Sequence, residues 1–270
     1  MELSQTIKRA CRRYESVEAE GLMLYPILVE EIELFEMARP SIDIVQQSLP
    51  VAYAAMPLLA AYYEMEYRAQ ENGDEPIGLF ASALLMLVLS LRLGKGLPAE
   101  ERMARLRLSV DREHPEKLRS VDFTLNGEEM CRVTPVQFQR LREIIAAQNG
   151  IELVSEDANP ELIQAERDLA ELNGVALKGG FADRIGTIAA LCHAEEEEID
   201  GWPILKLKNR EKAWRRITGY LICGIAEAQG TKWRGGNPHP SLFYEKADVG
   251  TSAVRPVESV TQGMEQRSSI

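Results

Sequence analysis

The most informative part of the chain is Ile77-Gly-Leu-Phe-Ala-Ser-Ala-Leu-Leu-Met-Leu-Val-Leu-Ser-Leu91, an uncharged stretch that ends at Arg92. A membrane span needs about 20 apolar residues, whereas shorter apolar runs more often form buried core helices. The stretch therefore predicts a central helix over residues 77–93 that is buried on all sides, and it favours this reading over a membrane span.

The charge and the cysteines exclude several classes of protein. The chain has 270 residues and a net charge of −11, which repels phosphate backbones and anionic lipids, so we expect neither nucleic acid nor a membrane as its main partner. The four cysteines lie far apart without a CxxC pair, which fits a reducing compartment. The amino terminus has no apolar run, so we expect neither a secretion signal nor an anchor there.

Residues 1–100 are predicted to form a helical unit that a short strand over 22–28 leads. Its expected helices cover residues 29–38, 42–55, 57–70 and 77–93. Pro40 is expected to end the first of them, and Asp74 is expected to cap the last.

In residues 101–150 the apolar side chains follow a different spacing, which predicts a β-hairpin region followed by a helix. Apolar residues alternate from Leu106 to Val110, and two further strand-like runs flank Asn126-Gly127, the dipeptide preferred in tight hairpins. Thr134-Pro135 then marks the start of a helix that ends at Asn149-Gly150 and is expected to pack on the small sheet.

Residues 151–245 are predicted to form a second helical unit, and 246–270 a disordered tail that has few large apolar side chains. The helices expected in this unit cover residues 160–172, 181–193 and 217–229. The predicted fold is mainly α with a small antiparallel β-hairpin region, an α+β class.

The local cluster that suggests a metal site is Cys192-His193 followed by the glutamates 195–198. A helix would place His193 and Glu197 on one face, since they are four residues apart. No second histidine stands at ligand spacing, so we expect a helix end followed by a solvated acidic turn, with no metal and no cofactor.

Catalytic signatures are missing from the sequence. His114, His193 and His239 accompany no GxSxG motif, and the glycines near Lys95 and Lys178 lack the spacing of phosphate-binding loops. We therefore expect no enzyme, and an unrecognised hydrolase is the remaining catalytic alternative.

A basic stretch over residues 206–216 holds six cations around Trp214. It suits RNA, an acidic protein surface, or a solvated helix face neutralised by the preceding glutamates, and the sequence leaves these alternatives open.

From about residue 180 the order of residues becomes specific. The informative segments are Arg184-Ile185, Ala189-Ala-Leu-Cys-His193, Ile199-Asp-Gly-Trp-Pro203, Trp214-Arg-Arg-Ile217, Cys223-Gly-Ile225, Trp233, Gly236-Asn-Pro238 and Pro240-Ser-Leu-Phe-Tyr244. Together they resemble tail proteins of long-tailed bacteriophages and of phage-derived tail particles, above all the tail assembly chaperones. Leu24-Tyr-Pro-Ile-Leu28, followed by an acidic helix, is similar to how several such chaperones begin, whereas the hairpin region 104–134 has no counterpart in the resemblance.

The resemblance implies a non-enzymatic protein of the host cytoplasm, with a possible homo-oligomer. Its partners would be the helical tape measure protein, whose apolar face it keeps from aggregating, and the tail-tube subunits that it recruits. The alternative is a permanent neck, tail-completion or baseplate subunit.

Two sets of residues are candidates for these roles. Side chains in the Met-, Tyr- and Leu-rich helices provide adaptable apolar contacts and are either a partner-binding stripe or plain core: Leu34, Phe35, Met37, Leu58, Leu59, Tyr62 and Tyr63. A structural motif is expected to fold residues 242–244 back onto a helix, and its members are Trp202, Trp214, Trp233, Gly236, Asn237 and Pro238.

Overall fold

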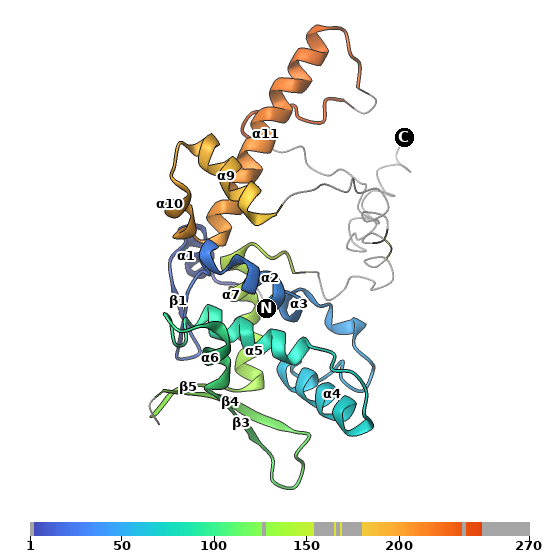
Figure 1. Ribbon diagram of the computed structural model, residues 1–270. Helices are drawn as coiled ribbons and strands as arrows, with labels where there is room; N and C mark the ends of the chain where they lie inside the picture. The colour runs from blue at the N-terminus through green and yellow to red at the C-terminus, as the bar shows by residue number, and fades with distance from the viewer. Residues whose placement is uncertain are drawn as a thin grey trace. The chain divides into compact units, whose positions relative to one another are not determined.

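The computed structural model describes residues 3–125, 128–153, 165, 168, 180–233 and 236–244 (Figure 1). The chain divides into two compact units, the first made of residues 1–156 with 200–205 and the second of 157–199 with 206–270. The protein is mainly helical with two small antiparallel sheets, which confirms the predicted fold class. The predicted ranges 1–100 and 101–150 both lie in the first unit, and the disordered tail stays a prediction because residues 246–270 lie outside the described part.

The first unit contains most of the secondary structure. Its elements are α1 (Gln5–Arg12), β1 (Val17–Ala19), β2 (Leu22–Leu24), η1 (Val29–Glu31), α2 (Ile32–Ala38), α3 (Pro40–Asp43), η2 (Gln46–Ser48), α4 (Leu58–Asn72), α5 (Leu79–Ser90), α6 (Ala99–Ala104), β3 (Leu106–Val110), β4 (Leu118–Leu125), β5 (Glu128–Val133) and α7 (Pro135–Asn149).

Helix α5 is the centre of this unit, as its apolar sequence predicts. Helices α2, α3, α4 and α6 all contact it (Figure 1), and every side chain from Leu85 to Ser90 is buried. Because neighbours cover all sides, the helix has no polar face. No helix among the described residues is long and apolar enough to cross a membrane.

The segment after β2 is held by polar groups of the two helices that flank it. The backbone N–H of Tyr25 donates to the carbonyl of Ser90 at the end of α5, at 2.8 Å. The N–H of Ile27 donates to Oδ1 of Asn149 at 3.0 Å, and Nε2 of Gln148 donates to the carbonyl of Leu24 at 3.3 Å. Asn149 is fully buried at the end of α7, so these bonds replace water for a buried backbone.

Residues 200–205 return from the second half of the chain to the other side of this segment. The N–H of Val29 donates to the carbonyl of Trp202, and the N–H of Ile204 donates to the carbonyl of Ile27, both at 2.9 Å. Trp202 is buried. The Trp202-Pro203 turn therefore completes the first unit although it lies far along the sequence.

The first predicted helix ends where expected, because α2 ends at Ala38, but the helix predicted over 42–55 is wrong. Pro40 begins the short helix α3, since its fixed φ and missing N–H suit the first helical position. Residues 44–57 are not an α-helix, because Ile44 is extended and Nε2 of Gln46 donates to the carbonyls of Ala54 and Met56, which closes the segment as a loop.

Asp74 does not cap the central helix, contrary to the prediction. The N–H groups of Ile77 and Gly78 donate instead to the carboxylate of Glu66 on α4, at 2.9 Å and 3.0 Å. A carboxylate from a neighbouring helix thus satisfies the donors that precede α5.

The hairpin region forms a three-stranded antiparallel sheet in the order β3-β4-β5, as predicted. Phe123 on the middle strand pairs with Leu106 and Cys131 and is buried. The turn dipeptide Asn126-Gly127 lies outside the described residues. Helix α7 follows with a complete capping box between Thr134 and Gln137, and it contacts β4 as well as α1 and α4.

The described part of the second unit is built on α9 (Phe181–Cys192), α10 (Glu196–Asp200) and α11 (Ile204–Ala228), although the ends of α10 and α11 at residues 200–205 belong to the first unit. Helix α11 begins well before the predicted residue 217, so the basic stretch 206–216 is part of one long helix. The helix predicted over 160–172 lies largely outside the described residues.

We predict that Asn149→Ala lowers the free energy of unfolding by about 2 kcal/mol, because the buried N–H of Ile27 loses its acceptor. The control is Asn72→Ala, since Asn72 is exposed and, like Asn149, is the last helical residue before a left-handed glycine. Denaturant unfolding of both variants measures the difference, and equal losses would contradict the role given to Asn149.

Candidate protein-binding surface

The second half of helix α11 packs against the segment that follows it in the sequence. Cys223 is buried, and a Cβ atom at Gly219 would lie 2.6 Å from the imidazole ring of His239, so the helix backbone touches that ring directly. Nε of Arg216 donates to the carbonyl of Leu242 at 3.0 Å. The segment 237–242 therefore covers the side of α11 that contains Gly219 and Arg216.

A local turn shapes this covering segment. Oδ1 of Asn237 accepts a hydrogen bond from the N–H of His239 at 2.7 Å, and Gly236 has a φ of 82°, which glycine adopts without strain. The hydroxyl of Ser241 accepts from the N–H groups of Phe243 and Tyr244, each at 3.2 Å. The chain thus turns back onto α11 as predicted, but the rings of Phe243 and Tyr244 remain exposed.

The other side of α11 exposes a row of large apolar side chains. Leu221 is 56% exposed, and Ile222 and Ile225 are each 60% exposed. Residues three and four apart lie on the same helix face, so the three form one continuous apolar strip, which we call the α11 strip. Single exposed apolar residues are common, but a contiguous strip on a helix is typical of surfaces that bind other proteins.

The exposed charges near the α11 strip have both signs. Arg210 and Arg215 are exposed on the same helix, and so is Glu227, two residues after Ile225. Glu211 forms a two-pronged ion pair with Arg184 of α9, whose Nη2 lies 2.7 Å from Oε2 of Glu211, so this carboxylate is already neutralised. The strip itself is uncharged.

Most of the predicted partner-binding stripe is core. Phe35, Leu58, Leu59 and Tyr62 are buried, and the hydroxyl of Tyr62 donates to the carbonyl of Ser41 at 2.9 Å. Burial raises the pKa of Tyr62, which keeps this donor protonated. Leu34 and Tyr63 are partly buried, and Met37 is 65% exposed. The structure thus places four of the seven side chains in the interior, which is the second of the two alternatives given above.

The predicted tryptophan motif divides between the two units. Trp202 belongs to the first unit, whereas Trp214 and Trp233 lie in the second and are partly buried. Gly236, Asn237 and Pro238 form the turn that precedes His239.

The α11 strip is not among the sites predicted from the sequence. Its signal is the apolar run from Tyr220 to Ile225. The run differs little in composition from parts of α5, so the sequence could not show which of the two helices is covered on all sides.

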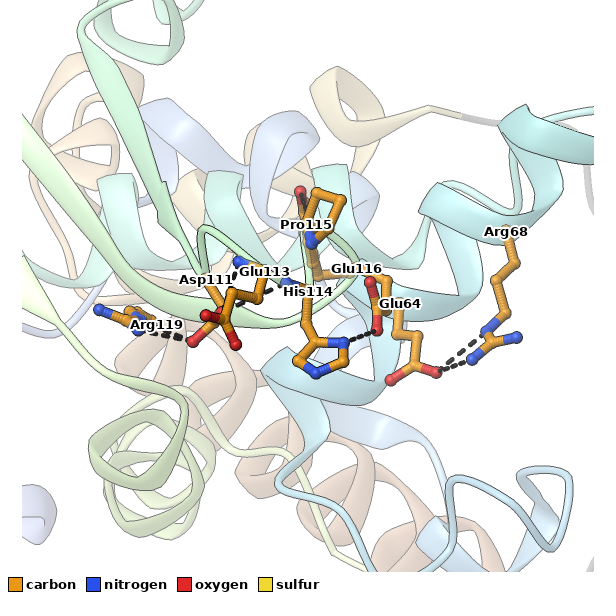
Figure 2. Close-up of polar contacts among 9 residues, drawn as sticks. Glu64, Arg68, Asp111, Glu113, His114, Pro115, Glu116 and Arg119 are labelled. Atoms are coloured by element: carbon orange, nitrogen blue, oxygen red, sulfur yellow. Dashed lines mark hydrogen bonds and ion pairs between the residues drawn. The ribbon is translucent and has the colours of Figure 1, made fainter.

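The polar cluster that most resembles a chemical site lies on the β3–β4 turn of the first unit (Figure 2). The carboxylate of Asp111 accepts hydrogen bonds from the N–H groups of Glu113 and His114, at 2.9 Å and 3.2 Å. Its other oxygen accepts from Nη2 of Arg119 at 2.5 Å. The hydrogen bond from Arg119, with further help from the two backbone donors, lowers the pKa of Asp111 to about 2. Asp111 is therefore a turn-forming anion.

The rest of this cluster fixes the turn to α4. The hydroxyl of Tyr63 donates to the carbonyl of Pro115 at 3.0 Å, and Nδ1 of His114 lies 3.2 Å from Oε1 of Glu116. On α4, Glu64 pairs with Arg68 at 2.6 Å (Figure 2). Each of these groups is engaged in a local contact, so the cluster holds a hairpin against a helix.

Cys192, His193 and the glutamates 195–198 are not arranged as the ligands of a metal site. His193 ends α9 in the left-handed conformation, and Glu197 lies on the next helix, α10, so one helix face does not carry both. Within the described ranges, no group of three or more His, Cys, Asp or Glu side chains is placed to hold a metal ion.

Comparison with known proteins identifies no family for this chain. No protein-family profile matches the chain, and no curated protein or solved structure matches it.

We predict that the β3–β4 turn loosens in acid. The pKa of Asp111 is lowered in the folded protein, so its contribution is complete above its ordinary value of 3.8 and is lost as the pH falls toward about 2. The amide chemical shifts of Glu113 and His114, followed by NMR, should change with a midpoint near 2. The variant Asp111→Asn should abolish this transition, and a midpoint at 3.8 would contradict it.

Proposed function

We propose that this protein is a non-enzymatic chaperone of bacteriophage tail assembly that binds the helical tape measure protein and presents it to tail-tube subunits. The α11 strip carries the proposal, because Leu221, Ile222 and Ile225 form an exposed apolar row on a helix whose other side is covered by the segment 237–242. The resemblance of residues 180–245 to tail assembly chaperones supports it from the sequence, and the strip lies inside that range.

Such a chaperone must cover the apolar stripes of its partner. A long helical partner with apolar stripes aggregates unless each stripe is covered, and an apolar row on a rigid helix covers it by helix-on-helix packing. The binding face must also stay exposed in the free protein. The α11 strip meets this condition, whereas the buried side chains of α4 do not.

A permanent neck, tail-completion or baseplate subunit is the alternative in the same setting. A chaperone is expected in the lysate bound to the tape measure protein and missing from purified tails. A permanent subunit is expected in purified tails at fixed stoichiometry. Immunoblots of both fractions separate the two, and detection in intact tails would overturn the chaperone proposal.

We predict that the double variant Ile222→Ser/Ile225→Ser recovers about tenfold less tape measure protein in the soluble fraction after co-expression, because apolar contacts at the centre of an interface carry most of the affinity. The matched control is Val51→Ser, since Val51 is 94% exposed and lies in the first unit. Both variants should keep the wild-type melting temperature, because the replaced side chains are exposed. Equal recovery of soluble tape measure protein with the two variants would contradict the binding role proposed for the α11 strip.

A further inference from the structure

The face of α11 that carries the α11 strip is occupied near the start of the helix and open near its end. Leu207 is fully buried, and Glu211, four residues later on the same face, is bound by Arg184 of α9. The same face continues turn by turn to Leu221 and Ile225. A helix that packs on the strip can therefore extend past the end of α11, but not toward its start, where α9 lies.

The open part of this face is uncharged and has the same kind of side chain at both of its ends. The α11 strip forms its middle, with side chains that are 56–60% exposed. Thr218 lies on one side of the strip and Ala228 on the other, and both are exposed. The steps from Thr218 to the strip, along it and on to Ala228 are three or four residues, which is the spacing of a coiled-coil seam.

We propose that the α11 strip of one copy of this chain packs on the α11 strip of a second copy, with the two helices antiparallel about a two-fold axis. A two-fold contact uses the same surface on both copies, so the surface has to match its own reverse. The inference goes beyond the proposed function, because it states what covers the strip when no tape measure helix is bound.

Antiparallel pairing matches every layer of the open face. With the axis level with Cys223, Ile225 of each copy lies over Leu221 and Ile222 of the other. The same register places Thr218 of each copy over Ala228 of the other. Large aliphatic side chains thus meet in the middle, and small ones meet at both ends.

The position of α9 excludes the parallel arrangement. Parallel helices would place their starts side by side on the face where Arg184 binds Glu211. In the antiparallel pair, the part of each helix that α9 covers lies beyond Ala228, the last helical residue of the other copy. The two copies therefore meet only through the open half of each α11.

The size of the contact predicts a reversible dimer. The strip and its two small neighbours would bury about 400 Å² on each copy, or about 800 Å² in total. Stable complexes bury about 1,200 Å² or more, so we expect a Kd on the order of 10–100 μM. A dimer this weak dissociates readily, and the strip stays available to the tape measure helix, which competes with the second copy.

The net charge of −11 on each copy opposes association and gives the dimer a distinctive response to salt. Salt screens repulsion between charges that lie more than about 10 Å apart at 0.1 M, whereas it does not weaken contacts between apolar side chains. The dimer is therefore expected to tighten as salt is raised. Binding to nucleic acid or to an anionic membrane would weaken instead.

The first test is sedimentation of the full-length protein between about 1 μM and about 200 μM, a range that brackets the expected Kd. We expect the wild type to change from monomer to dimer, and Ile222→Ser/Ile225→Ser to weaken association at least about tenfold. The matched control is Ile77→Ser/Val136→Ser, which replaces side chains of the first unit that are 48% and 51% exposed and should leave the Kd unchanged.

The second test determines the direction of the helices. Thr218→Cys protein and Ala228→Cys protein are mixed and oxidised with copper phenanthroline, and the cross-linked peptides are identified by mass spectrometry. Antiparallel pairing predicts a disulfide between positions 218 and 228. Thr218→Cys protein alone should not cross-link through that position, because the two copies of it are about 15 Å apart along the helix axis.

The outcomes separate this inference from the proposed function. A wild type that stays monomeric throughout, a dimer that Ile222→Ser/Ile225→Ser leaves intact, or a cross-link between two copies of position 218 overturns the inference. So does a monomer that binds phosphatidylserine vesicles through the strip. If the dimer forms as described while the tape measure protein fails to co-purify, the inference holds and the proposed function fails. A protein that is monomeric throughout but holds the tape measure protein through the strip gives the reverse result.

Discussion

Residues 24–28 cross the interior of the first unit outside any helix, and most of their backbone partners are supplied by other elements. Asn149 and Gln148 of α7 meet this segment from one helix, the end of α5 meets it from another, and residues 202–204 meet it from far along the chain. A buried backbone group without a partner costs about 1–3 kcal/mol, so these bonds fix where α5, α7 and the Trp202 turn lie within the unit. The predicted strand at 22–28 pairs with a neighbouring strand over Leu22–Leu24 and forms a single bridge between Leu28 and Pro203. Between them, side chains and backbone groups of other elements provide the partners.

The two units use apolar residues in different ways. In the first unit, α5 is covered by four helices, and Leu58, Leu59 and Tyr62 of α4 are buried in the interior. In the second, α11 is packed against the segment 237–242 on one side and exposes the α11 strip on another. Exposed apolar area on a packed helix costs free energy unless a partner covers it, and for this reason we assign the binding role to α11.

The two units also differ in what their charged side chains bind. The carboxylates on the β3–β4 turn bind Arg119, His114 or backbone donors, so they stabilise a local structure. Within α11, Glu211 is paired with Arg184, whereas Arg210, Arg215 and Glu227 are exposed. The exposed charges of this helix thus have both signs, and the α11 strip itself is uncharged.

The sequence by itself determined the elements whose signals are local. The uncharged run 77–91 specified a buried helix, the alternation at 106–133 specified the hairpins, and Thr134-Pro135 specified a capped helix start, because each depends on neighbouring residues alone. The tertiary structure decided what depends on distant groups. Glu66 on α4, and not the adjacent Asp74, provides the acceptor before α5, and the loop from 44 to 57 is closed by Gln46. The tertiary structure also decided which apolar helix face stays exposed. The apolar runs in α5 and α11 are similar in sequence, but four helices cover α5, whereas Leu221, Ile222 and Ile225 of α11 remain exposed.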